Sequence, residues 1–363
     1  MTPKAAIRAE ADRLFAAFQV AGAVPVDADI LLPAETLLDL YGEDIRAKAY
    51  VTTDPVLGEM MLRPDFTVPV VQAHMAHGAD PARYCYSGEV FRAQDHLGAL
   101  ARESLQVGFE IFDRQAPERA DAEVFALFGA LLAGLNLRAV TGDIGILMAA
   151  VRGISASDQR KAALLRHIWR PKRFRALLDR FSGRAPMPAA RAALLARLAA
   201  GAPADLIAAA GPLIGLREAD EIAARAATLL EDAKAAPISA LEAAMLYDLL
   251  QLQAPAPAAL IHLRGIAVHL PAILLAVERF AARLEALQSH GVEVATLAFE
   301  ASHGRTAMEY YDGFVFSFLN GEEVVASGGR YDALTAVLGQ GRSIPAVGGI
   351  IRPHLVAALR GAA

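Results

Sequence analysis

Two strand-like segments carry side chains that could bind a small polar ligand: "RYCYSGEVFR" (83–92) and "ESLQVGFEIFD" (103–113). Because side chains alternate between the two faces of a strand, Gln106 and Glu110 share one face of the second segment. The matching face of the first segment ends in Arg92. A guanidinium can bind a carboxylate, whereas an amide and a carboxylate together can bind an ammonium or imidazole group. The pattern therefore predicts a polar floor that suits a zwitterion.

The same face has a second interpretation, because polar residues that alternate along a strand usually mark a solvated surface. Each segment also carries a glycine on this face, Gly88 in the first and Gly108 in the second. Glycine weakens a strand, and close approach of another group is a frequent reason for its presence. From the hairpin alone, a solvated face and a ligand-binding floor both remain open.

A glycine pair later in the chain could also allow a ligand to approach bare backbone. Gly328-Gly329 lies beside Tyr331 and closes the clearest hairpin in the sequence, "YYDGFVFSFLNGEEVVASGG" (310–329). The Asn-Gly dipeptide within that hairpin is the strongest short hairpin signal. Alternatively, the glycine pair forms a turn next to a surface salt bridge made by Arg330.

Two other groups of residues could do chemistry, and we expect neither to do so. His74 and His77 lie three residues apart on a predicted helix, but no third ligand is close in the sequence, so we expect no metal site. Trp169 lies within "RHIWRPKRFR" (166–175), a composition that could suggest nucleic acid binding. In a chain of formal charge −5, a helix end with arginines along its surface is the better interpretation.

The expected elements are those of an α+β fold with antiparallel strands and no βαβ rhythm. The N-terminal segment has the apolar spacing of an amphipathic helix. We expect Thr67 to cap another helix that ends near Gly78. In the later hairpin, Phe314, Phe316 and Phe318 alternate, which predicts one buried strand face.

The domain organisation follows from a change in composition near the middle of the chain. From about Ser155 to Pro255, alanine, leucine and arginine dominate, which favours helices throughout. We therefore predict the first part of a core at residues 1–150, an all-helical insertion at 151–258, and the second part of the core at 259–363.

The composition restricts the class of protein further. The chain has 363 residues and is 55% apolar, so it can bury a large core. Its single cysteine, Cys85, excludes an intramolecular disulfide and suits a reducing compartment. No apolar run is long enough to cross a membrane, and the N-terminus is a poor signal peptide. We expect a cytoplasmic protein that contacts neither membranes nor nucleic acids.

In combination, these segments resemble the catalytic core of class II aminoacyl-tRNA synthetases, and histidyl-tRNA synthetases in particular. The similar segments are "LRPDFT" (62–67), "YSGEVFRAQ" (86–94) with "RESLQVGFEIFD" (102–113), "EYYDGFVF" (309–316), "ASGGRYDAL" (326–334) and "PAVGGIIRPHL" (345–355). In that order they resemble the family's LRPE-x-T segment, motif 2 with its histidine-contacting strand, the two histidine-specific segments, and the start of motif 3. The resemblance implies a class II synthetase-like antiparallel sheet flanked by helices.

Residue by residue, the resemblance implies a histidine pocket. Asp65 and Thr67 would hold the amino group, with the family's glutamate shortened to aspartate. Gln106 and Glu110 would share the ammonium and imidazole end, and Arg92 would face the carboxylate.

Aromatic residues and the glycine pair would complete this pocket. Tyr310, Tyr311 and Tyr331 would wall the imidazole, and Gly328-Gly329 would let it approach the backbone. The result agrees with the strand pattern, which was interpreted independently of the family, and it favours a ligand-binding floor over a solvated face.

The half of the site that would bind a nucleotide departs from the family. Adenylation needs arginines to stabilise charge on the phosphates of ATP. The position of the motif 3 arginine is Leu355, and that of the arginine before the tyrosine pair is Thr306, with Arg305 one residue out of place. The glutamate that follows the motif 2 arginine is replaced by Gln94. The chain also ends shortly after motif 3, so we expect no anticodon-binding domain.

Family members with these departures are the regulatory subunits of ATP phosphoribosyltransferase. The resemblance implies a non-catalytic protein without a cofactor, which forms a homodimer inside a hetero-oligomer with the short-form catalytic subunit. It would be needed for that subunit's activity in the first step of histidine biosynthesis and for feedback inhibition by L-histidine. The alternatives are a compact histidyl-tRNA synthetase-like ligase that activates histidine for a non-tRNA acceptor, and a structural activator whose pocket is unused.

Overall fold

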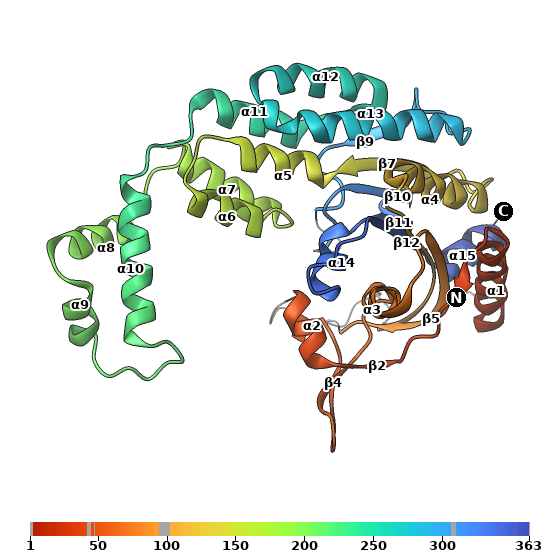
Figure 1. Cartoon of the computed structure of the whole chain (residues 1–363), viewed down its shortest axis with the longest axis horizontal. Helices are drawn as coiled ribbons and strands as arrows, with labels where there is room; N and C mark the ends of the chain where they lie inside the picture. The colour runs from red at the N-terminus through yellow and green to blue at the C-terminus, as the bar shows by residue number, and fades with distance from the viewer. Residues whose placement is uncertain (1–2, 42–44, 47, 94–101, 306–309, 363) are drawn as a thin grey trace.

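The computed structural model describes residues 3–41, 45–46, 48–93, 102–305 and 310–362. A body built around one large sheet carries a curved helical arm that extends away from it (Figure 1). The mixture of a large antiparallel sheet with many helices confirms the predicted α+β class.

Among the described residues, nine strands form the large sheet in the order β1-β5-β6-β12-β11-β10-β7-β9-β8. Their bounds are β1 Val24–Pro25, β5 Ala82–Phe91, β6 Glu103–Phe112, β7 Arg138–Asp143, β8 Gln253–Pro255, β9 Ala298–Glu300, β10 Phe314–Asn320, β11 Glu323–Arg330 and β12 Ala346–Ile351. Only the pairs β1 with β5 and β7 with β9 are parallel. The two predicted hairpins are confirmed as β5–β6 and β10–β11, and β12 pairs with the second strand of each.

One face of this sheet is covered by helices α1 (Lys4–Val20), α4 (Pro117–Leu131) and α15 (Pro353–Ala362), with α13 (Leu274–Ser289) packed on α4. The covering is largely aromatic: Phe109 of β6 lies 5.2 Å from Phe18 of α1, measured between ring centroids. The rings of Phe314, Phe316 and Phe318 all contact Phe125 of α4, which confirms the predicted buried face of β10.

The opposite face is partly covered by helices α3 (Thr67–His77) and α14 (Asp332–Leu338), which contact each other. A three-stranded sheet of β2 (Leu31–Pro33), β4 (Gly58–Leu62) and β3 (Val51–Asp54), with helix α2 (Ala34–Tyr41), completes this side. The prediction that Thr67 caps α3 is wrong. The N-cap is Phe66, and the Thr67 hydroxyl instead lies 3.2 Å from the hydroxyl of Tyr310.

The segment predicted as an insertion is helical, and it runs from the end of α5 (Ile144–Gly153) to β8. Its helices are α6 (Asp158–Arg166), α7 (Pro171–Phe181), α8 (Ala189–Ala200), α9 (Pro203–Ala209), α10 (Ala219–Lys234) and α11 (Ala240–Gln251), followed by α12 (Ala256–His269) and the short helix η2 (Pro271–Ile273). Phe174 and Leu246 belong to the same buried cluster as the sheet, so α7 and α11 are part of the body. Helices α8, α9 and α10 form the arm (Figure 1).

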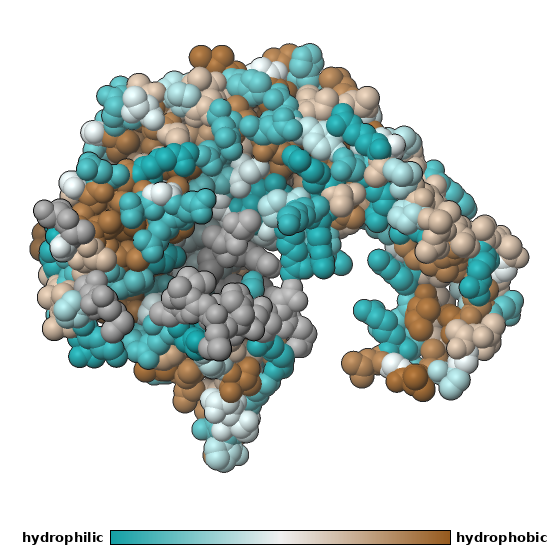
Figure 2. Space-filling view, turned by 180° about the vertical axis from the view of Figure 1, so that it is seen from behind, coloured by the Kyte–Doolittle hydropathy of each residue, from teal (hydrophilic) through white to brown (hydrophobic). Residues whose placement is uncertain are grey.

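The arm is joined to the body by a buried ion pair and exposes apolar residues at its end. Arg160 of α6 donates from Nε to Asp232 of α10 at 2.6 Å. Leu213, Ile214 and Leu216, between α9 and α10, are exposed, and Figure 2 shows hydrophobic surface at this end of the arm. No single described helix is long and apolar enough to span a membrane, although α8 and α9 together have the length and apolar composition of one such helix, with a bend of 116° between them.

Candidate ligand-binding site

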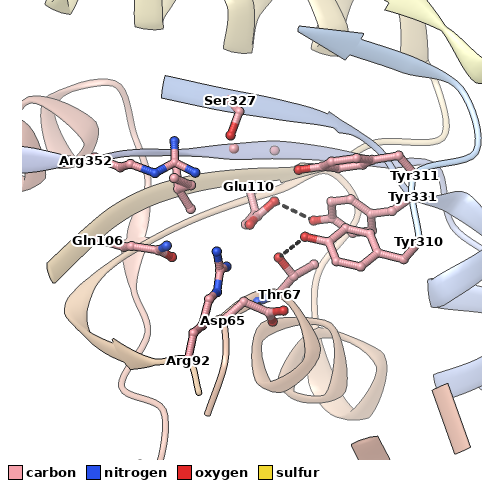
Figure 3. Close-up of a pocket in the computed structure, with 13 residues that line it drawn as sticks. Asp65, Thr67, Arg92, Gln106, Glu110, Tyr310, Tyr311, Ser327, Tyr331 and Arg352 are labelled. Atoms are coloured by element: carbon pink, nitrogen blue, oxygen red, sulfur yellow. Dashed lines mark hydrogen bonds between the residues drawn. The ribbon is translucent and has the colours of Figure 1, made fainter. Parts of the chain in front are cut away.

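A cavity of about 170 Å³ lies on the face of the large sheet opposite α1 and α4. It is walled by the central strands, the start of α3 and the segment before β10 (Figure 3). Its lining residues are Asp65, Thr67, Arg92, Gln106, Glu110, Tyr310, Tyr311, Ser327, Tyr331, Gly348, Gly349, Ile350 and Arg352. Eight of the ten residues expected from the sequence are therefore brought together around one cavity.

The polar residues of β6 point into this cavity and not into solvent. The exposed fraction is 2% for Gln106 and 1% for Glu110, which excludes the solvated-face interpretation. In β12, the residue opposite Glu110 is Gly348. A Cβ atom on Gly348 would lie 1.5 Å from Oε2 of Glu110, so this glycine makes the space that the carboxylate occupies.

Two tyrosines hold the Glu110 carboxylate. The hydroxyl of Tyr86 donates to Oε1 at 2.9 Å, and the hydroxyl of Tyr331 donates to Oε2 at 2.6 Å. Burial raises the pKa of Glu110 to about 8, although the two phenols oppose this shift by stabilising the charged form. The Glu110 carboxyl group therefore keeps its proton to a higher pH than an exposed glutamate does.

The glycines of the β5–β6 hairpin make room for protein groups. A Cβ atom on Gly108 would lie 2.1 Å from the ring of Tyr86, so this ring crosses directly over the glycine. A Cβ atom on Gly88 would lie 2.6 Å from the Arg63 guanidinium, which is stacked on Phe66. The close approach inferred from the sequence is real, and the approaching groups are internal side chains.

Asp65, Thr67 and Tyr310 form the wall next to the start of α3. Oδ1 of Asp65 accepts a hydrogen bond from the backbone N–H of Thr67 at 3.1 Å. The hydroxyl groups of Thr67 and Tyr310 are within hydrogen-bonding distance of each other (Figure 3). The ring of Tyr310 makes edge contacts with Tyr311 and Tyr331, with centroid distances of 4.7 and 6.0 Å.

The structure places Gly328 and Gly329 behind the cavity wall, and neither is a lining residue. A Cβ atom on Gly328 would meet the Phe316 ring at 2.5 Å, on the side of the sheet that faces α4. One on Gly329 would meet the Tyr311 ring at 2.8 Å, so Gly329 lets that ring lie flat against β11. The backbone that reaches the cavity belongs to Gly348 and Gly349 of β12.

Arg330, next to this glycine pair, does not form the surface salt bridge that was one interpretation of the sequence. Its Nη2 is paired with Asp121 at 2.6 Å, and Arg283 is paired with the same carboxylate at 2.8 Å. All three side chains are buried. This ion network fixes the end of β11 and thereby the position of the neighbouring Tyr331.

The cationic end of the cavity contains one lining residue that was not among the site residues expected from the sequence. Arg352, between β12 and α15, lines the cavity together with Arg92, and Figure 3 shows both guanidinium groups near Gln106. Among the described residues, Oε1 of Gln106 is buried without a hydrogen-bond partner. The arginine was visible in the sequence, but its orientation depends on the turn into α15.

The structure describes only some of the residues that depart from the family in the nucleotide-binding half of the site. Thr306 and Gln94 lie outside the described residues. Leu355 lies on α15 and is not a lining residue of the cavity. Arg305 is buried elsewhere: its Nε donates to the carbonyl of Ile168 at 2.6 Å, and its guanidinium lies over Phe174.

Trp169 and His74 have structural contacts. The indole Nε1 of Trp169 donates to the carbonyl of Tyr311 at 3.3 Å, which joins the helical segment to the cavity wall. His74 is stacked on Phe112, and its Nδ1 lies 3.1 Å from the hydroxyl of Tyr84. Within the described part of the chain, no cluster of three or more potential metal ligands is present.

The sheet, its flanking helices and the polar cavity define a protein of the histidyl-tRNA synthetase-like class. A family model described as histidyl-tRNA synthetase matches residues 2–254 and 219–354. A solved structure described as an ATP phosphoribosyltransferase regulatory subunit/histidyl-tRNA synthetase from Bacillus halodurans has a TM-score of 0.70 at 21% identity, covering 98% of this chain and 79% of that one. The histidyl-tRNA synthetase from Nostoc sp. has a TM-score of 0.64 at 18% identity, covering 99% and 73%.

Two curated relatives are more similar in sequence. Both are ATP phosphoribosyltransferase regulatory subunits. That of Allorhizobium ampelinum is 32% identical, covering 91% of this chain and 92% of the relative. That of Mesorhizobium japonicum is 33% identical, covering 99% and 98%. The chain therefore belongs to the family of ATP phosphoribosyltransferase regulatory subunits.

Proposed function

We propose that this chain is a non-catalytic subunit that senses L-histidine on behalf of a short-form ATP phosphoribosyltransferase catalytic subunit. The observation that carries the proposal is the cavity, which has guanidinium groups at one end and carboxyl groups toward the other. Arg92 and Arg352 lie at one end, and Asp65 and Glu110 lie toward the other (Figure 3). A free amino acid has the same separation of charge, with its carboxylate and its ammonium group a few bonds apart.

The polar groups of the cavity suit an imidazole side chain in particular. The phenols of Tyr310 and Tyr331 and the Glu110 carboxylate can exchange hydrogen bonds with the two ring nitrogens. Oε1 of Gln106, which has no hydrogen-bond partner among the residues that the structure describes, can accept a further N–H. A buried acceptor without a partner costs about 1–3 kcal/mol, so a ligand that supplies the missing donor regains that free energy.

The absence of adenylation is supported by the positions of two residues. Leu355 carries no charge where the resemblance places an arginine, and Arg305 is turned toward Ile168 and Phe174. Losing one group that stabilises charge on a reacting centre typically costs about 3–4 kcal/mol of barrier. Together with the names of its curated relatives, this favours a binding protein over a ligase.

In the proposed assembly, the chain forms a homodimer and joins catalytic subunits in a larger cytoplasmic complex. Histidine in the cavity favours a less active arrangement of that complex, with a coupling free energy of about 1–3 kcal/mol. Because such coupling is reciprocal, substrates bound to the catalytic subunit must change the affinity for histidine by the same factor.

Co-expression of this chain with a short-form catalytic subunit tests the proposal. The expected result is that the two proteins co-purify, that ATP phosphoribosyltransferase turnover requires both, and that L-histidine inhibits the complex. Turnover by the catalytic subunit alone, at the rate of the mixture, would contradict the proposal.

Arg352 supports one alternative function, a histidine-activating ligase, because it adds a second guanidinium to the cavity that Arg92 lines. Histidine-dependent ATP–pyrophosphate exchange by the purified chain is the readout. We expect no exchange above the level of a control without histidine; measurable exchange would replace the sensor with an enzyme.

A further inference from the structure

The cationic end of the cavity holds two guanidinium groups whose partners among the described residues are backbone carbonyls. Nε of Arg92 donates to the carbonyl of Pro64 at 3.2 Å, and Nη1 of Arg352 donates to the carbonyl of Val324 at 2.9 Å. Neither arginine forms an ion pair with a carboxylate of the described residues. Each guanidinium has five N–H donors, so several donors on both side chains remain available to a ligand.

Backbone hydrogen bonds fix the position of Arg352 at the cationic end of the cavity. Its N–H donates to the carbonyl of Val325 at 3.0 Å, and its own carbonyl accepts from the N–H of Leu355 at 3.1 Å. The residue thus forms the junction between β12 and α15, and the bond to Val324 holds the side chain across β11. A guanidinium held in this way loses little conformational freedom when it binds a ligand.

Two like charges in a partly enclosed space repel each other unless an anion lies between them. Burial, and next the nearby charge of Arg92, lowers the pKa of Arg352 to about 10. A carboxylate placed between the two guanidiniums would relieve both effects, and its two oxygens match the planar fork of an arginine. Ser327, which lines the cavity above Arg352 in Figure 3, adds a hydroxyl donor at the same end.

We propose that Arg352 binds the carboxylate of the ligand together with Arg92, and thereby selects a free amino acid over one whose carboxyl group is amidated or esterified. This inference rests on the proposed function, because it assigns a selective role within the same site. An amide or an ester has no negative charge on its acyl oxygen, so it leaves the two arginines without a counter-charge. The cavity would then report the free amino acid pool and ignore aminoacyl derivatives.

Calorimetric titration of the full chain with L-histidine and with L-histidinamide tests this selectivity. We expect wild type to bind histidine at least roughly 100-fold more tightly than the amide, because removing one partner of a desolvated charge pair costs about 2–5 kcal/mol. In Arg352→Gln, the preference should fall by a factor of about 10 or more, through lost affinity for histidine and not through gained affinity for the amide. Arg360→Gln, an exposed arginine further along α15, is the matched control and should behave as wild type.

The outcomes separate this inference from the proposed function. If wild type binds histidine and Arg352→Gln keeps the full preference, the role of Arg352 is refuted and the sensor remains. If wild type binds no histidine, the sensor itself is refuted, and the selectivity with it. Circular dichroism checks that each variant folds. Should Arg352→Gln fail to fold, Arg352→Lys tests the inference, because lysine keeps the positive charge but lacks the planar guanidinium. A preference for histidine over histidinamide between that of wild type and none supports the inference, and an unchanged preference overturns it.

Discussion

The two ends of the cavity differ in how many hydrogen bonds their polar side chains already make with other side chains. At the acidic end, the Glu110 carboxylate already accepts two phenolic hydrogen bonds, and the hydroxyls of Thr67 and Tyr310 already face each other. At the cationic end, within the described part of the chain, Arg92 and Arg352 have backbone partners only and Oε1 of Gln106 has no partner. One end is a network of hydrogen bonds between side chains, whereas at the other end the two guanidiniums bond to backbone carbonyls of the described residues.

This difference indicates a division of labour within the site. A finished network holds its groups in fixed positions and so determines the shape of the ligand that fits. Unpaired charges gain most from the arrival of a counter-ion and so determine how much free energy binding releases. The acidic end can be perturbed in four ways, which differ in the size of the expected effect.

The largest effect is expected from Glu110→Ala, which removes the centre of the acidic network and leaves the hydroxyls of Tyr86 and Tyr331 without their acceptor. Histidine affinity should fall by roughly 100-fold or more, since unpaired buried groups add about 1–3 kcal/mol each. Inhibition of the complex by histidine should be lost in parallel, measured as the inhibitor concentration at half activity.

The matched control is Glu103→Ala, an exposed carboxylate on the same strand, which should leave inhibition as it is. Unchanged inhibition in Glu110→Ala would show instead that the chain activates its partner through a scaffold alone.

The titration of Glu110 should be visible in the pH dependence of stability. Its folded-state pKa of about 8 lies above its usual value of 4.5, so the folded chain holds a proton that the unfolded chain releases. The free energy of unfolding should therefore fall as pH rises from about 4.5 to 8, by an amount on the order of 4 kcal/mol from this residue.

Urea denaturation of wild type and Glu110→Gln across this range measures the effect. The variant cannot release a proton, so its stability should fall less steeply. Asp312, whose pKa is raised by burial to about 7, acts in the same direction in both proteins, so their difference isolates Glu110. Equal slopes would mean that Glu110 is ionised in the free protein.

Gly348→Ala should disturb the acidic end without removing any polar group. The added Cβ would lie 1.5 Å from Oε2 of Glu110, so the carboxylate must move away from Tyr331. Overpacking of this kind costs about 1–3 kcal/mol, and histidine affinity should fall by roughly tenfold. The control is Gly361→Ala, where an added Cβ meets nothing within 4 Å. Equal affinity in the two variants would contradict the placement of Glu110.

The smallest effect is expected from Tyr310→Phe, which deletes one hydroxyl next to Thr67. A single neutral hydrogen bond is worth about 0.5–1.5 kcal/mol, so histidine affinity should fall about threefold. Combining it with Thr67→Val should give less than the sum of the two single effects, because both remove the same contact. Full additivity would show that the two hydroxyls act on the ligand independently.

Much of the fold was predictable because its signals are local. The alternation of Gln106 and Glu110, the Asn320-Gly321 turn and the three alternating phenylalanines each depend on a few neighbouring residues. For residues far apart in the chain, such as Asp65 and Tyr331, only the resemblance to a known family predicted a shared site. The order of the nine strands could not be derived from local pattern alone.

The errors at the site have a common physical cause, which is side-chain direction. Gly328 and Gly348 are both strand glycines, and only the register between β11, β12 and β6 decides which one faces the cavity. Arg352 was visible in the sequence, but its orientation depends on the turn between β12 and α15. Thr67 has the chemistry of a helix cap, yet its hydroxyl is directed toward Tyr310.

The most direct test is a calorimetric titration of L-histidine into the purified complex of this chain with a short-form catalytic subunit. The account predicts saturable binding by the cavity, with an affinity that changes when the substrates of the catalytic subunit are present. Absence of histidine binding at millimolar concentration would contradict it.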